Sequence, residues 1–137
     1  MLESVIASGL MIILMATAIP NFTTLGSSYN LRQTSHQIAA EFQRTRMRAI
    51  ARNARYRFTY DASTRTYTVE RESAPGIFVA EYSNQLPTGV TLGTIATPPI
   101  FDSRGMLNAT TNIPVTVQGG THTRTVTINV LGQVSFS

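Results

Sequence analysis

The feature that most constrains this chain is a long uncharged stretch near its start. No charged residue occurs from Ser4 to Leu31. A membrane-spanning helix needs about 20 predominantly apolar residues, and the apolar part of this stretch reaches that length when it extends through Phe22 and Leu25. The sequence therefore predicts that residues 1–25 form a helix able to cross a bilayer.

A secretory signal peptide is the main alternative for this segment, because Ala16-Thr17-Ala18 has the small-x-small pattern of a cleavage site. A signal peptide has a positively charged leading region, however, and no Lys or Arg precedes the apolar run. A buried core helix is also disfavoured, since so apolar a segment lies at the end of the chain. The membrane-spanning helix is the preferred interpretation.

One carboxylate, that of Glu3, stands at the start of the apolar run. A charged side chain at the bilayer centre costs about 2.5–3.5 kcal/mol, so an acid at the edge of a membrane helix indicates a functional site. No basic neighbour is close in sequence, and we therefore expect a partner group to meet Glu3. The alternative is a carboxylate at the headgroup level that only marks the membrane boundary.

The N-terminal segment resembles the first helix of type IV pilins and type II secretion pseudopilins. The resemblance rests on Leu2-Glu3, the apolar run and Ile19-Pro20-Asn21-Phe22. In that family a Pro follows the Glu by 17 residues, and Pro20 follows Glu3 at the same spacing. The family also has four residues before the Glu and a cleaved basic leader ahead of them. Only Met1 and Leu2 precede Glu3 here, so we expect Met1 to differ from the family's mature terminus.

The resemblance implies an assembly role for Glu3 and Pro20. In related filaments the conserved carboxylate pairs with the free, usually methylated, terminal amine of a neighbouring subunit, so Glu3 would set the register between subunits. Pro20 would loosen one turn of the long helix, since a Pro removes a backbone hydrogen bond. The family location is the bacterial inner membrane, with a single pass and a periplasmic head, and then a periplasmic or extracellular filament.

Weaker similarities further along the chain match the FimT/GspH branch of minor pilins and minor pseudopilins. They lie in the segments Phe42–Asn53, Ile100–Gly105 and Val130–Val134. The branch implies a minor structural subunit of a type IV pilus or of a type II secretion pseudopilus, whose partners are other pilin or pseudopilin subunits. The alternatives are a DNA-binding minor pilin of natural transformation and a major pilin of a surface filament.

Residues 26–137 are predicted to form a helix continuation and a β-rich head. A helical pattern runs from Leu31 to about Arg55, with an apolar side formed by Leu31, Ile38, Phe42 and Ala49 and flanked by Ala39 and Ile50. Pro20 and Gly26 lie between this pattern and the apolar run. We interpret the two as one long helix with a weak point near Pro20.

After Arg55 the pattern changes to strands. The expected strands are 56–60 and 65–70 around a turn at 61–64, then 78–82, 113–117, 123–130 and 133–136. The segment 87–99 is expected to be irregular, and Asp102-Ser103-Arg104-Gly105 is expected to be a turn. The fold class is therefore α+β: a long N-terminal helix packed on a small antiparallel β-sheet, which is the pilin fold by resemblance.

Arginines dominate the charge of the chain, which has 11 basic residues, 7 acids and a formal net charge of +4. Four of them fall in a narrow sector of the helix: Arg44, Arg48, Arg52 and Arg55. Glu41 shares this sector, so one pair with Arg44 is available and the other arginines are expected to be unpaired along the helix. A solvated face or a contact with another subunit is favoured for this stripe over a phosphate-binding strip.

Arg46 is different, because it projects into the apolar sector of the same helix beside Phe42 and Ala49. A guanidinium in an apolar sector needs a hydrogen-bond acceptor. We therefore expect a partner for Arg46 from the sheet or from another subunit.

DNA binding is weakly supported. FimT relatives that capture DNA use a C-terminal Gly-Arg-x-Arg, whereas the matching place here is Gly132-Gln133-Val134-Ser135. Phosphate contacts supply most non-specific affinity, so the loss of both arginines weakens this function. Arg104 and Arg124 can compensate only if the fold brings them together.

No pattern in the sequence points to an enzyme, a cofactor or a metal site. There is no Cys, and the two histidines, His36 and His122, are isolated from each other. No phosphate-binding Gly loop or metal-ligand spacing occurs. A head without disulfides depends on its own packing and on neighbouring subunits, so oligomerisation is expected.

Overall fold

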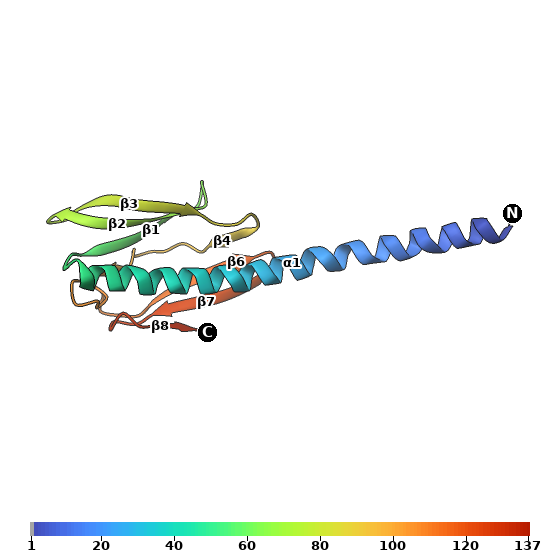
Figure 1. Cartoon of the computed structure of the whole chain (residues 1–137). Helices are drawn as coiled ribbons and strands as arrows, with labels where there is room; N and C mark the ends of the chain where they lie inside the picture. The colour runs from blue at the N-terminus through green and yellow to red at the C-terminus, as the bar shows by residue number, and fades with distance from the viewer. Residues whose placement is uncertain (1) are drawn as a thin grey trace.

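The computed structural model describes the backbone of residues 2–137 and the side chains of residue 26 and residues 28–137. One long helix, α1, is followed by eight strands that form a head at its C-terminal end (Figure 1). The elements are α1 Leu2–Ala51, β1 Tyr56–Asp61, β2 Thr66–Ala74, β3 Ile77–Gln85, β4 Val90–Leu92, β5 Ile100–Phe101, β6 Ile113–Gly119, β7 His122–Ile128 and β8 Val134–Phe136.

Helix α1 is continuous over 50 residues, which is about 75 Å at 1.5 Å per residue. The prediction of a single long helix is confirmed. Its predicted end near Arg55 is wrong, because the helix stops at Ala51. Asn53 adopts a left-handed φ of 49°, and the amides of Asn53 and Ala54 bond back to the carbonyls of Ile50 and Ala49. This is a Schellman cap, for which Asn is the common alternative to Gly.

The strands form two four-stranded antiparallel sheets, with the orders β3-β2-β1-β5 and β4-β6-β7-β8. The predicted hairpin around residues 61–64 is confirmed, and its register pairs Tyr60 with Tyr67. The predicted α+β class, a long helix packed on antiparallel strands, is confirmed, although the strands form two sheets where one was expected. The irregular conformation expected throughout 87–99 is wrong. Val90–Leu92 alternates buried and half-buried residues and adds a short strand to the edge of β6.

The core lies between α1 and the inner faces of the two sheets. The predicted apolar side of the helix is buried, and Ile38, Phe42 and Ala49 are 0% exposed. Phe42 meets Phe58 of β1 edge to face at 4.8 Å, and Phe58 stacks on Tyr67 of β2 at 5.3 Å. Complete burial of each such side chain contributes about 1.5–3 kcal/mol. The apolar side of α1 is thus the surface against which both sheets pack.

Two turns close over the C-terminal part of α1. The predicted turn at Asp102–Gly105 is confirmed, because the Asp102 carboxylate accepts hydrogen bonds from the amides of Arg104 and Met106, both at 2.9 Å. Gly105 in this turn has a φ of 78°, and Gly132 in the β7–β8 turn has a φ of 76°. A methyl group on Gly132 would overlap with the Gly105 carbonyl oxygen. Both positions therefore require glycine.

We predict that Gly132→Ala lowers the free energy of unfolding by about 3 kcal/mol, because it adds a steric overlap to a left-handed backbone. Gly76→Ala is the matched control: its φ is 78° and no atom lies within 4 Å of the added Cβ. The control is expected to lose only about 1 kcal/mol. Urea denaturation of the full chain in detergent measures both values, and equal losses would contradict the packing argument.

Candidate functional site

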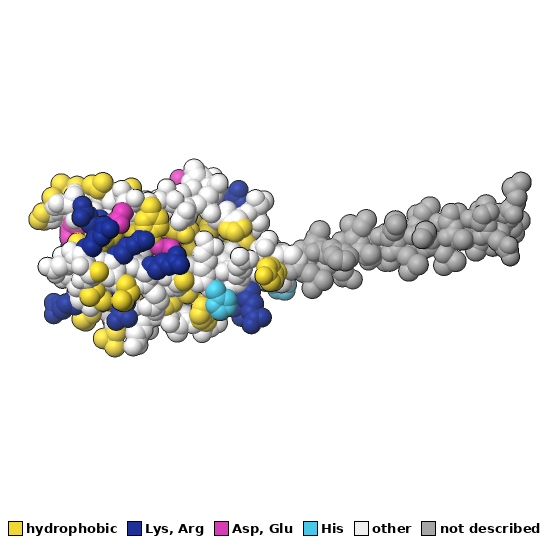
Figure 2. Space-filling model, viewed as in Figure 1, with side chains coloured by type: hydrophobic (Ala, Val, Ile, Leu, Met, Phe, Trp, Pro, Cys, Tyr) yellow, Lys and Arg dark blue, Asp and Glu magenta, His cyan; other side chains and the backbone are white. Residues whose placement is uncertain are grey.

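The arginine stripe is formed by Arg44, Arg48, Arg52 and Arg55 and lies beside the hairpin of β2 and β3. Figure 2 shows dark-blue basic and magenta acidic side chains interleaved along the face on which α1 runs. The predicted pair of Arg44 with Glu41 is present, but Arg48 also lies 3.9 Å from Glu41, so the prediction that the other arginines are unpaired along the helix is wrong for Arg48. Arg52 lies 3.1 Å from Glu81 of β3, and Arg55 lies 2.9 Å from Glu72 of β2. The stripe therefore ties the end of the helix and the segment after it to the first sheet.

Glu41 is the buried member of this arrangement, with 4% of its surface exposed. Nη1 of Arg44 and Nη1 of Arg48 each lie 3.9 Å from one of its oxygens, so they attract the carboxylate without a short hydrogen bond. Burial raises the pKa of Glu41, and the charges of Arg48 and Arg44 oppose this increase. Burial therefore makes the charged form of Glu41 less favourable than it is in water, and the two arginines offset part of this desolvation cost.

Arg48 also stacks on the ring of Tyr82 in β3, with its guanidinium carbon 4.4 Å from the ring centroid. The hydroxyl groups of Tyr60 and Tyr82 are buried in the described structure without a hydrogen-bond partner, and so is one nitrogen of Arg48. Polar groups of this kind are costly unless they are satisfied. The contact between α1 and the first sheet is therefore partly polar.

A second polar group forms where α1 ends. The Tyr56 hydroxyl donates to Glu81 at 2.7 Å, and Arg52 donates to the same hydroxyl at 3.3 Å. Burial raises the pKa of the Tyr56 hydroxyl, and the hydrogen bond to Glu81 adds to this effect. The register of β2 and β3 shifts at Glu81, since Val69 pairs with Tyr82 and Glu70 with Ala80. This bulge re-aims Glu81 toward Arg52 and Tyr56.

Arg46 finds its expected partner within the chain. Its Nε donates to the Gly105 carbonyl oxygen at 3.0 Å, across 59 residues of sequence. The same side chain packs beside Gly132, within 3.2 Å of where a Cβ would stand. The partner comes from the turn before β6 and not from the sheet itself.

Arg104 and Arg124 are not brought together. The turn that carries Arg104 lies next to the end of β7, because the Leu107 amide donates to the Val130 carbonyl at 3.0 Å. Arg124 lies six residues before Val130 on an extended strand, which is about 20 Å away. These two arginines therefore do not replace the missing Gly-Arg-x-Arg.

The described side chains include no group of His, Cys, Asp and Glu that could hold a metal ion. An open cavity of about 400 Å³ lies between the loops before and after β5 and has no ionisable side chain in its wall. His36 packs against Phe136 at 4.8 Å, and neither histidine joins a cluster of possible ligands.

Glu3 and Pro20 lie on the backbone of α1, but their side chains are outside those that the structure describes. Their assembly roles, and the division between residues 1–25 and 26–137, stay predictions. Among the residues whose side chains are described, no helical segment is long and apolar enough to cross a membrane.

Residues 34–132 match the family model described as type II transport protein GspH. No curated protein matches the chain. The minor pseudopilin EpsH of the type II secretion system of Vibrio cholerae superposes with a TM-score of 0.64 at 15% identity, over 79% of this chain and 96% of EpsH. The type IV minor pilin FimU of Pseudomonas aeruginosa gives a TM-score of 0.66 at 13% identity, over 80% of this chain and 90% of FimU. At these identities the similarity shows the fold.

We predict that Glu41 gives the stability a distinct pH dependence. Its pKa is raised in the folded chain, so above the ordinary value of 4.5 the folded state binds more protons than the unfolded state. The contribution of Glu41 to the free energy of unfolding must then decrease as the pH rises from 4.5 through the raised pKa.

Glu41→Gln removes this contribution. The difference in unfolding free energy between Glu41→Gln and the unchanged chain should shift in favour of the variant as the pH rises over that window. Urea denaturation at several pH values measures the difference. A difference that is constant with pH would show that Glu41 has the same pKa in both states.

Proposed function

Because the chain belongs to the GspH family of type II transport proteins, we propose that it is a minor structural subunit of a helical filament, either a type II secretion pseudopilus or a type IV pilus. The observation that carries this proposal is the combination of the family match over 34–132 with a fold shared by a minor pseudopilin and a minor pilin. Both of those proteins are described as minor subunits, which favours a minor over a major role here.

The shape of the molecule supports assembly through the N-terminal part of α1. Among the described side chains the first buried one is Leu31, and Figure 1 shows the preceding part of the helix extending away from the head. A single helix without tertiary partners is only marginally stable in water. Lipid or the helices of other subunits can supply the missing contacts, and an uncharged sequence suits both.

The proposed sequence of states begins in the inner membrane. Residues 1–25 anchor the chain there with the head on the periplasmic side, and the same helix then enters a bundle of subunits in the filament. Glu3 pairs with the terminal amine of a neighbour, because a buried carboxylate is stabilised only by a well-placed opposite charge. Pro20 gives the helix the local freedom to bend as it is transferred.

The arginine stripe positions the head and has no direct role in joining subunits. Arg52 and Arg55 pair with acids of the first sheet, and Arg48 stacks on Tyr82 of β3. These three members fix the head on the helix and are less available to a neighbour. A filament subunit benefits from this arrangement because movement of the helix during assembly then carries the head with it.

We predict that Glu3→Ala reduces the amount of this chain in purified filaments by roughly tenfold or more, since losing a hydrogen bond to a charged group costs about 1.5–3 kcal/mol. Quantitative immunoblotting of sheared filaments and of membranes measures the distribution between them. The membrane pool should not decrease, because the apolar anchor is unchanged.

Ser4→Ala is the matched control, as it alters the adjacent residue without removing a charge, and it should be incorporated normally. Normal incorporation of Glu3→Ala would contradict the pairing role. Absence of the unchanged chain from both pili and pseudopili would contradict the proposed function itself.

A further inference from the structure

Arginines in this head differ in whether an acid lies beside them. Six have an acid within 4.0 Å, and all six belong to the part of the head around the C-terminal half of α1, the hairpin of β2 and β3 and the turn after β5: Arg44, Arg48, Arg52, Arg55, Arg57 and Arg104. Among the described side chains, five arginines have no acid at ion-pair distance. Arg46 donates instead to the Gly105 carbonyl oxygen, and Arg71 lies on β2; the other three are Arg32, Arg65 and Arg124.

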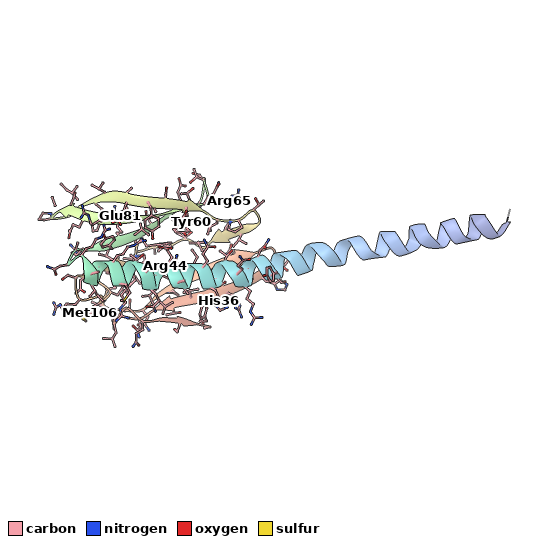
Figure 3. All side chains as sticks on the ribbon, viewed as in Figure 1. His36, Arg44, Tyr60, Arg65, Glu81 and Met106 are labelled. Carbon is pink, nitrogen blue, oxygen red and sulfur yellow. The ribbon has the colours of Figure 1, made fainter. Side chains whose placement is uncertain are left out.

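Arg32, Arg65 and Arg124 lie at one end of the head, which we call the base. Arg32 is adjacent to Leu31, the first buried residue described on α1, so it marks the place where the helix enters the head. Arg124 lies near the start of β7, and Figure 1 shows the β6–β7 turn next to that place. Figure 3 labels Arg65 and His36 toward the same end, whereas Met106 lies at the opposite end.

The base has few negative charges to neutralise the arginines. Asp61, the last residue of β1, is the acidic side chain described there, and hydrogen bonds from Ser63 lower its pKa and keep it charged. One acid against three arginines leaves the base positive. Figure 2 shows the cyan histidine side chains next to basic ones at this end.

The backbone at Arg65 adds a separate observation. Arg65 has a φ of 54°, a left-handed conformation that Gly or Asn adopts more easily than a long side chain. The turn would form without strain with a glycine there. A cation at a strained position, with no acid at ion-pair distance among the described side chains, points to a role outside the chain.

The distance along α1 relates the base to a membrane. Leu25, the predicted end of the membrane segment, and Arg32 are seven residues apart, which is about 10 Å of helix. The polar layer of a bilayer extends about 5–8 Å beyond the hydrocarbon on each side. The Debye length at physiological ionic strength is about 8 Å. The base therefore stands within electrostatic reach of lipid phosphates when residues 1–25 span the bilayer.

We propose that Arg32, Arg65 and Arg124 form a docking surface for the anionic phospholipid headgroups of the membrane that anchors the chain. This inference rests on the membrane-anchored state in the proposed function. The surface holds the head against the bilayer before assembly and sets its rotation about α1. The contacts must be released when the subunit moves into the filament, so the surface also opposes premature extraction.

The test uses the full chain in lipid nanodiscs. The sequence has no cysteine, so Thr121→Cys in the exposed β6–β7 turn places a single fluorophore at the base. Nanodiscs contain phosphatidylcholine alone or mixed with phosphatidylglycerol, and each includes a lipid with a nitroxide quencher on its headgroup. Quenching reports how often the base contacts the headgroups.

We expect stronger quenching in the anionic nanodiscs, and about 1 M salt should abolish the difference because it shortens the Debye length to about 3 Å. Arg32→Gln, Arg65→Gly and Arg124→Gln should each lower the contact equilibrium by about fivefold. Arg65→Gly also suits the left-handed backbone, so it tests the charge without disturbing the turn.

Arg71→Gln is the matched control. Arg71 is exposed and has no acid partner in the described structure, and it lies six residues from Arg65 along β2, at about 20 Å. It should leave quenching unchanged. Equal quenching in neutral and anionic nanodiscs, or an equal effect of Arg71→Gln, overturns this inference alone. Failure of the chain to enter nanodiscs overturns the membrane-anchored state together with it.

Discussion

The buried face of α1 is the surface on which the rest of the head depends. Both sheets pack against it, through β1 and β5 on one side and β4, β6, β7 and β8 on the other. Phe42 is fully buried there and connects the helix to the stacked rings of Phe58 and Tyr67. Each sheet has four strands and one inner face, and neither has another hydrophobic layer to cover it. The two sheets therefore depend on the C-terminal half of α1 to complete their hydrophobic core.

Polar contacts complete this attachment at the first sheet. Arg48, which lies beside the buried Glu41 of the same helix, stacks on the ring of Tyr82 in β3. Glu81 and Tyr56 bind Arg52 where the helix ends. Breaking one partner of a buried pair is costly, so such contacts favour a single orientation of helix and sheet. A filament subunit needs this orientation because its helix and its head meet different neighbours.

Much of the fold could be predicted from local sequence patterns. The features that the sequence analysis missed depend on contacts between residues far apart in the chain, which local spacing does not reveal. The apolar positions of α1 and the alternation around residues 61–64 predicted the helix face and the first hairpin. The pairs of Arg52 with Glu81 and Arg55 with Glu72 join residues 29 and 17 positions apart, and a bulge positions one of them. Asn53 carried a signal for the helix end, since Asn is a common C-terminal cap residue. The three residues of β4 carried no comparable sequence pattern that would have predicted a strand.

The central claim is that this chain is a minor subunit of a filament. The most direct measurement is to shear surface filaments from the native cell, separate them from membranes, and quantify this chain against the other filament proteins by mass spectrometry. The account predicts small amounts of this chain beside a more abundant pilin, or retention in the envelope with the pseudopilus of a secretion system. Recovery as the dominant filament protein would contradict the minor role, and absence from every filament and pseudopilus fraction would contradict the account as a whole.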